Sequence, residues 1–373
     1  MRTLGIEEEL LVVDQETGEP SARAERVIRR APWQLRDQDA SRWDHDGPGG
    51  NVGPELKQQQ LEVDTPPRAR LEELLEDLRA WRRASATAAE QEGALIVASG
   101  TSPAPVKPLT TPDERYGRMV DRFGVTAEDQ LTCGCHVHVS VEGDDEGVGV
   151  LDRIRPWLPA LLAISANSPF WSGRDSGYAS FRSQAWNRWP SAGPTDVFGS
   201  ADAYHRLVDD MIASGVILDD GMVYFVARLS SSYPTVEIRA ADICLDPADA
   251  VLVAGLCRGL VETAAREWAA GRPPAALPTA MLRLAMWQAA KSGVEGQLLD
   301  PGTSRPRPAR EVLDALVDHV RPALDEAGDL EQVRAGVDRV VARGNGAVRQ
   351  RSVLARTGSW TDVVTDLAKA TAD

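Results

Sequence analysis

The chain has 373 residues, of which 43% are hydrophobic, and its formal net charge is −15. This length and apolar content are enough for a large buried core. The acidic balance argues against a nucleic-acid-binding protein, which normally presents a basic surface, so we expect no nucleic-acid partner. No apolar run is long enough to cross a bilayer, and no apolar leader precedes the first strand-like segment, so we expect no membrane contact and a cytoplasmic location. The four cysteines are unevenly spaced, which predicts reduced thiols.

Along the chain, short strand-like runs alternate with long amphipathic helices, which predicts a single α+β domain over residues 1–373. Strands are expected over residues 3–13, 56–63, 95–99, 131–141, 222–229 and 235–243. Helices are expected over residues 70–92, 148–166 and 247–270, with a further helical series after residue 278. Polar residues with possible chemical roles concentrate in the strands.

The first predicted strand carries three consecutive carboxylates, Glu7, Glu8 and Glu9, inside an apolar run. Alternation places Glu7 and Glu9 on one face, roughly 7 Å apart, and Glu8 on the other. Because ionised carboxylates are costly to bury, this pattern indicates a divalent metal, an arginine, or a strand end that emerges into water. Glu8 shares its face with apolar residues, and we expect it to pair with an arginine.

A second acidic segment holds Glu55 and Glu62. Their separation would place them on opposite faces of one regular strand, so they can reach a common site only if a bulge or a helical turn intervenes. The alternative is an exposed strand edge with solvated glutamates.

A third segment places His136, His138 and Ser140 on one face of a strand, with Cys133 and Cys135 on the other. Two histidines separated by one residue often bind a metal together, because the two-residue repeat brings both imidazoles over one ion. The alternative is a pair of hydrogen-bonded histidines that line a polar pocket. A mixed cysteine and histidine zinc site would require the strand to break.

In a fourth segment, Thr235, Glu237 and Arg239 share one face of a strand. Glu237 and Arg239 could form a surface ion pair, worth under about 1 kcal/mol. They could also act separately in one pocket. Glu237 could then hold a metal, while the planar guanidinium of Arg239 clamps the oxygens of a transferring phosphoryl group.

In their order along the chain, these motifs resemble the glutamate-cysteine ligases of the second type, also called carboxylate-amine ligases. The resemblance runs nearly end to end. It is carried by the segments 5–10, 62–66, 135–139, 167–175, 234–239 and 344–351, together with Glu55, Tyr178, Ser180, Phe181, Arg182 and Asp242.

This resemblance implies a fold like the catalytic domain of glutamine synthetase, in which a curved antiparallel sheet forms a funnel backed by helices. It implies ATP and Mg²⁺ as cofactors, and Glu237 and Arg239 as the residues that carry catalysis, with Arg239 as the phosphoryl clamp. The implied metal ligands are Glu7, Glu9, Glu55, Glu62, His136 and Glu237.

The implied reaction is ATP-dependent amide formation through an acyl phosphate. Its substrates would be small molecules, a carboxylic acid such as glutamate and an amine such as cysteine. Because water would hydrolyse the acyl phosphate, a lid is expected, and residues 344–351 are the candidate segment, with a solvated helix end as the alternative. The expected substrate-binding residues are Arg174, Arg182 and His138, and the expected ATP-binding residues are Arg239, Arg349 and Arg351.

Two other functions stay open on the sequence. His136 and His138 could hold zinc for hydrolysis, or the same fold could serve a metal–nucleotide-binding protein with little turnover. The family resemblance also suggests a homodimer.

Overall fold

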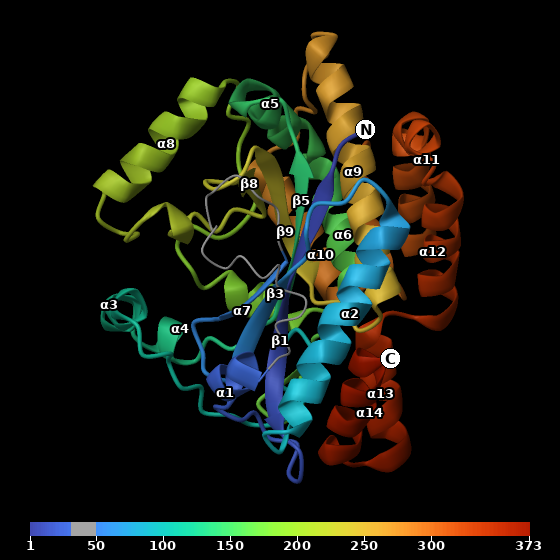
Figure 1. Cartoon of the computed structure of the whole chain (residues 1–373). Helices are drawn as coiled ribbons and strands as arrows, with labels where there is room; N and C mark the ends of the chain where they lie inside the picture. Colours follow the sequence, from blue (N-terminus) through green and yellow to red (C-terminus); the bar gives the residue numbers. More distant parts are fainter. Residues whose placement is uncertain (31–49) are drawn as a thin grey trace.

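The computed structural model describes residues 1–30 and 50–373. Within these residues, a main antiparallel sheet of seven strands has the order β2-β3-β1-β5-β9-β8, and β4 pairs with β1. Figure 1 shows these strands between two groups of helices. Their bounds are β1 Leu4–Asp14, β2 Asn51–Pro54, β3 Gln60–Asp64, β4 Ala94–Val97, β5 Gly134–Ser140, β8 Ala227–Leu229 and β9 Thr235–Asp242.

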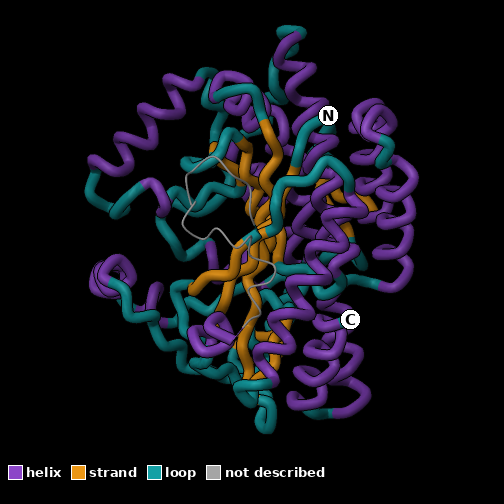
Figure 2. The backbone as a smooth tube through the Cα atoms, viewed as in Figure 1, coloured by secondary structure: helices purple, strands orange, loops and turns teal. Residues whose placement is uncertain are grey.

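A layer of long helices covers one face of the sheet, and shorter helices with long loops lie on the other side (Figures 1 and 2). The covering layer contains α2 (Leu71–Glu90), α6 (Leu158–Ser165), α9 (Pro247–Ala269), α11 (Ala309–Ala327) and α12 (Leu330–Arg343). The opposite side holds α3 (Glu114–Phe123), α4 (Val125–Glu128), α7 (Phe181–Trp186) and α8 (Ala201–Ala213).

Other elements complete the chain. They are α1 (Ala24–Arg30), α5 (Asp144–Ile154), α10 (Thr279–Ser292), α13 (Gly346–Thr357), α14 (Trp360–Ala372), and the strand pairs β6 (Phe170–Trp171) with β7 (Arg174–Asp175) and β10 (Gln297–Leu299) with β11 (Pro306–Pro308). No helix in the described residues is both long and apolar enough to cross a membrane.

The main core lies between the sheet and α9. Leu4 and Ile6 of β1, Val137 of β5 and Ile238 of β9 are buried there against residues such as Leu256. Burial of each such side chain stabilises the fold by about 1.5–3 kcal/mol. Because side chains alternate along a strand, this apolar face leaves the intervening polar residues on the opposite face.

Glu8 is the exception on the apolar face, and its expected arginine partner is confirmed. Arg82 of α2 donates to both carboxylate oxygens of Glu8, at 2.8 and 2.6 Å, and both side chains are buried. The same guanidinium donates to the carbonyl oxygens of Cys244 and Leu245, each at 2.7 Å. The guanidinium is therefore hydrogen-bonded both to the carboxylate of Glu8 and to two backbone carbonyl oxygens. A buried charge is tolerated when it is paired and hydrogen-bonded in this way.

Several predicted element bounds require correction. Within the strand predicted over residues 56–63, only residues 60–63 are strand, as part of β3. Residues 56–59 belong to the reversal that starts at Glu55 and joins β3 to the antiparallel strand β2, which the prediction missed. The helix predicted over residues 148–166 is α5 and α6, separated by a 3-10 turn that contains Pro156, which lacks an N–H for a continuous helix. Of the strand predicted over residues 222–229, only β8 forms.

The pairing of β5 with β9 is irregular beside His136. Cys135 pairs with Ala241, whereas Val137 pairs with Ile238, so β9 carries an extra residue at this point. Such a bulge changes which side chains share a face beyond it. As a result, Asp242 pairs with Gly134 at the end of the sheet and lies on the polar face.

Candidate active site

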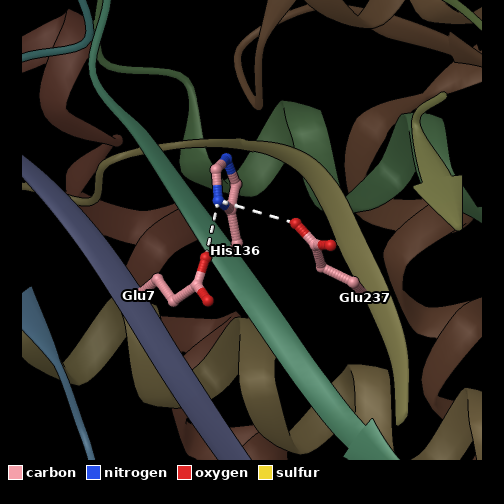
Figure 3. Close-up of side chains that lie close together, drawn as sticks. All are labelled: Glu7, His136 and Glu237. Atoms are coloured by element: carbon pink, nitrogen blue, oxygen red, sulfur yellow. Dashed lines mark hydrogen bonds and ion pairs between the residues drawn. The ribbon is translucent and has the colours of Figure 1, made fainter. Parts of the chain in front are cut away.

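Three neighbouring strands bring the first group of predicted residues together. Glu7 of β1 contacts both histidines of β5, with its carboxylate oxygens 3.1 Å from Nδ1 of His136 and 3.0 Å from Nε2 of His138. Glu237 of β9 approaches Nδ1 of His136 from the other side, at 3.8 Å. Figure 3 shows Glu7, His136 and Glu237 pointing toward one another from these strands.

A second group lies beside the first. Ligand atoms of Glu9, Glu62 and His136 fall within 4.8 Å of one another, as do those of Glu7, His136 and Glu237. Glu9 also accepts a hydrogen bond of 2.5 Å from the backbone N of Gly134. Because Glu62 lies on β3 and is paired with Glu9 across the strands, the geometry needs no bulge in β3.

Glu55 reaches this group by the chain reversal after β2, and its carboxylate lines the same cavity as Glu62. Burial, followed by the charge of Glu9, raises the pKa of Glu55 to about 7. Burial and the charges of Glu55 and Glu7 raise the pKa of Glu62 well above its ordinary range. These shifts show that the cluster disfavours so many ionised carboxylates without a compensating cation.

The residues present fit a hard divalent cation. The cluster offers carboxylate oxygens, the ligands that Mg²⁺ prefers, and Nε2 of His136 is buried without a hydrogen-bond partner in the described structure. Cys133 and Cys135 belong to neither group. Burial raises the pKa of both thiols, as expected of core cysteines.

Glu237 is held by two arginines. Nε of Arg228 on β8 lies 2.6 Å from one carboxylate oxygen, and Arg239 contacts the other. Burial alone would raise the pKa of Glu237, but the charges of Arg239 and Arg228 lower it to about 2. Glu237 is therefore an ionised carboxylate that faces His136 on one side and fixes Arg239 on the other.

Two adjoining cavities lie over the polar face of the sheet. The acidic cavity, of about 510 Å³, is lined by the glutamates of β1, β3 and the reversal, and by His136. The arginine-lined cavity, of about 410 Å³, is lined by Arg182, Arg188, Arg239 and Arg283 and, within the described residues, by no carboxylate. The two cavities share Trp186, Trp189, Tyr224 and Arg239.

Arg182 of α7 lines the second cavity and is deeply buried. Its side chain donates no hydrogen bond within the described structure. Only 3% of the residue is exposed, and its guanidinium lies 5.7 Å from the ring centroid of Trp186. Nη1 lies 4.0 Å from Oδ1 of Asp242, and Nε has no partner among the described residues. Its side chain therefore lines the cavity and donates no hydrogen bond to the described protein atoms.

The other predicted arginines line neither cavity. Arg174 is exposed on β7, Arg349 forms an ion pair with Asp366 at 2.7 Å, and Arg351 forms one with Asp175. Each of the last two guanidinium groups is already engaged by a carboxylate on the outer side of the molecule.

The expected lid at residues 344–351 requires correction, because this segment is the packed beginning of α13. Asn345, which caps the helix, and Gln350 are buried. Gly346 contacts Asn167 so closely that a Cβ there would overlap its side chain. Glycine serves close packing at this position.

The sequence reasoning missed charged residues in and beside the acidic cavity. Arg115 and Asp219 line the cavity, and Asp64 lies beside its glutamates. Asp64 pairs with Glu7 across the strands, and burial and the charge of Glu7 raise its pKa to about 7. The sequence could have predicted this position, because Asp64 follows Glu62 by two residues and alternation places both side chains on one face. Arg115 and Asp219 form a bidentate ion pair, each contact 2.7 Å, between α3 and the loop after α8. Nothing in the sequence pairs these distant residues.

Comparisons with known proteins agree with this architecture. Residues 3–370 match the model of glutamate-cysteine ligase family 2. A relative from Streptomyces avermitilis, named "Putative glutamate--cysteine ligase 2-1", is 53% identical over 100% of this chain and 99% of its own length. A relative from Streptomyces coelicolor is 51% identical with the same coverage.

Two solved structures share the fold. The glutamate–cysteine ligase of Francisella tularensis, in complex with AMP, has a TM-score of 0.64 and 14% identity, and the match covers 100% of this chain and 88% of that one. The bifunctional glutathione synthetase of Pasteurella multocida has a TM-score of 0.69 and 15% identity, and this chain spans 52% of its length. The expected curved antiparallel sheet backed by helices is thereby confirmed. The chain belongs to glutamate-cysteine ligase family 2, a family of ATP-dependent ligases that form carbon–nitrogen bonds.

Proposed function

We propose that this protein joins a carboxylic acid, with glutamate as the first candidate, to an amine through an acyl phosphate formed from ATP. One observation carries the proposal: a cluster of metal-ligating carboxylates and an arginine-lined cavity meet at Arg239. A metal-bound triphosphate suits the acidic side of this junction, and an anionic acid suits the arginine side.

The proposed Mg²⁺ ligands are Glu7, Glu9, Glu55, Glu62, His136 and Glu237. When bound, Mg²⁺ would neutralise charge on the phosphate oxygens of ATP. All six residues lie on or beside strands of one rigid sheet, which favours a fixed ligand geometry.

Arg239 is the proposed phosphoryl clamp. Its Nε is buried without a partner in the described residues, while its Nη1 is held by Glu237. The guanidinium is therefore oriented on one edge and available on the other. In the proposed reaction an oxygen of the acid attacks the γ-phosphorus, and the bond between that phosphorus and the ADP oxygen breaks. Arg239 then stabilises charge on the transferring group.

In the second step, the nitrogen of the amine attacks the acyl carbon, and the bond to the phosphate oxygen breaks. The amine loses a proton, and phosphate leaves. Arg182 is the proposed anchor for the second carboxylate of the acid, because its buried guanidinium keeps its donors free within the arginine-lined cavity. The names of the relatives support glutamate as the acid and cysteine as the amine.

Other residues expected from the sequence have weaker structural support. A role for His138 in substrate binding is still a prediction, and its ring nitrogens lie 2.9 Å from Thr235 and 3.0 Å from Glu7. Roles for Arg174, Arg349 and Arg351 receive no support from their positions outside the two cavities. A homodimer and a cytoplasmic location also remain predictions.

A phosphate-release screen of amino acids against amines, with ATP and Mg²⁺, tests the proposal. We expect release that requires an acid and an amine together, loss of that release in Glu237→Ala, and normal release in Glu72→Ala, which alters an exposed site on α2. The proposal fails if no pair exceeds the ATP-only background and Glu237→Ala behaves like the wild type. Hydrolysis that needs zinc and no ATP would favour the zinc alternative instead.

A further inference from the structure

The end of β9 holds a buried carboxylate, Asp242, that the proposed reaction does not use. It is fully buried, and it accepts hydrogen bonds from Oγ of Ser168 at 2.6 Å, Oγ of Ser180 at 2.8 Å and the backbone N of Asn167 at 2.9 Å. Burial raises the pKa of Asp242, whereas these three hydrogen bonds and the charge of Arg182 oppose that shift. Because all three partners donate, their geometry favours the ionised form of the carboxylate.

Arg182 is the positive charge nearest to this carboxylate among the described ion pairs, with Nη1 4.0 Å from Oδ1 of Asp242. This distance is too long for a hydrogen bond, so the interaction is electrostatic and uses none of the guanidinium's donors. The same Ser168 hydroxyl that donates to Asp242 accepts from the backbone N of Arg182, at 2.9 Å. One serine therefore ties the carboxylate to the start of α7.

Two further contacts shape the space around the guanidinium. Gly134 lies against it, and a Cβ at this position would come within 2.8 Å of Cζ of Arg182. The indole of Trp186 lies on another side, with its ring centroid 5.7 Å from Cζ. A glycine, an aromatic ring and a remote carboxylate thus hold a charged group in place while leaving its N–H groups free.

The bulge in β9 makes this arrangement possible. Without the extra residue opposite His136, Asp242 would share the apolar face with Ile238, because both have even spacing along the strand. The bulge instead pairs Asp242 with Gly134, at the end of β9 and the start of β5.

The network also involves the segment at residues 344–351, which packs as the start of α13 and does not form a lid. Nε2 of Gln350 on α13 donates to Oδ1 of Asn167 at 2.8 Å, and Nδ2 of Asn167 donates to the carbonyl oxygens of Ala98 and Ile243, each at 2.9 Å. The start of α13 therefore helps to fix Asn167, whose backbone N–H donates a hydrogen bond to Asp242.

We propose that Asp242 is a positioning residue, which holds the guanidinium of Arg182 by charge so that its donors face the acid substrate. This inference rests on the proposed function, because it assigns Arg182 to the acid. It adds that the specificity for an anionic acid depends on a residue that never touches it.

Asp242→Asn tests the charge with little change of shape. The amide oxygen can still face Ser168 and Asn167, and the hydroxyl of Ser180 can rotate to accept from the amide NH₂. We expect the KM for glutamate to rise about tenfold or more, while kcat and the KM for ATP change by less than about threefold. Ser180→Ala keeps the carboxylate and is the matched control, with a smaller rise.

A double-mutant cycle separates positioning from a general structural role. If Asp242 acts through Arg182, Asp242→Asn should add nothing to the KM for glutamate in an Arg182→Gln background. The proposal would be overturned if the effects of the two substitutions on the KM for glutamate were additive. It would also be overturned if Asp242→Asn lowered kcat and raised the KM for ATP as strongly as it raised the KM for glutamate.

Crystal structures of the wild type and of Asp242→Asn, without substrate, give a readout that needs no activity. We expect the guanidinium of Arg182 to leave its place beside Trp186 in the variant, with the surrounding backbone unchanged. An unmoved guanidinium would refute the positioning role even if the screen found no substrate. Conversely, a moved guanidinium in a protein that releases no phosphate with any pair would refute the proposed ligation alone.

Discussion

The crowded carboxylates predict that the metal-free protein loses stability as pH rises. The pKa of Glu55 is about 7 in the folded chain, because of burial and then the charge of Glu9, against an ordinary value of 4.5. Between these values the folded state binds more protons than the unfolded state, so the free energy of unfolding falls as pH rises through this window. The gap corresponds to about 3 kcal/mol, and we expect about 1–3 kcal/mol because Glu55 is partly exposed.

Urea unfolding at about pH 5 and about pH 8 measures this loss, with and without Mg²⁺ and ATP. Glu55→Gln should flatten the decrease, whereas Glu72→Gln, an exposed control on α2, should leave it unchanged. Since Mg²⁺ binds ionised carboxylates, it should stabilise the wild type more at the higher pH. Equal pH dependence in the wild type and Glu55→Gln, with equal stabilisation by Mg²⁺ at both pH values, would refute this reasoning.

Three further predictions concern single positions. Arg82→Met leaves Glu8 buried without its partner and should lower the free energy of unfolding by about 3–5 kcal/mol in urea, with partial recovery in the double variant Arg82→Met/Glu8→Gln. Glu237→Gln frees Arg239 from its ion pair and should reduce phosphate release by about 100-fold or more, as steady-state kinetics will show; near-normal kcat would contradict the clamp. Gly346→Ala overlaps Asn167 and should cost about 1–3 kcal/mol of stability by thermal unfolding, and an unchanged Tm would argue against close packing.

Strand alternation predicted much of the site. The faces of Glu7, Glu9, His136 and Glu237 follow from a period of two, and the structure places all four over one face of the sheet. The partner type of Glu8 also followed from its apolar face, although the sequence could not name Arg82, which approaches from α2. Local periodicity fixes which face a side chain occupies.

Contacts between distant segments were beyond that reasoning. The reversal after β2 that brings Glu55 to Glu62 depends on strand pairing, and the bulge that turns Asp242 depends on the register between β5 and β9. Arg351 shows the opposite failure, since its charge suggested phosphate binding whereas Asp175 engages it at the surface. Which carboxylate an arginine meets is decided by tertiary packing.

The central claim is that the acid is activated by phosphorylation, and isotope transfer tests it most directly. Glutamate that carries heavy oxygen in its side-chain carboxylate is incubated with the enzyme, ATP, Mg²⁺ and cysteine, and the released phosphate is examined by mass spectrometry. The proposed reaction predicts one labelled oxygen in each phosphate released, because the carboxylate oxygen that attacks the γ-phosphorus leaves with it. Phosphate that forms together with the amide but carries no label would contradict the acyl phosphate.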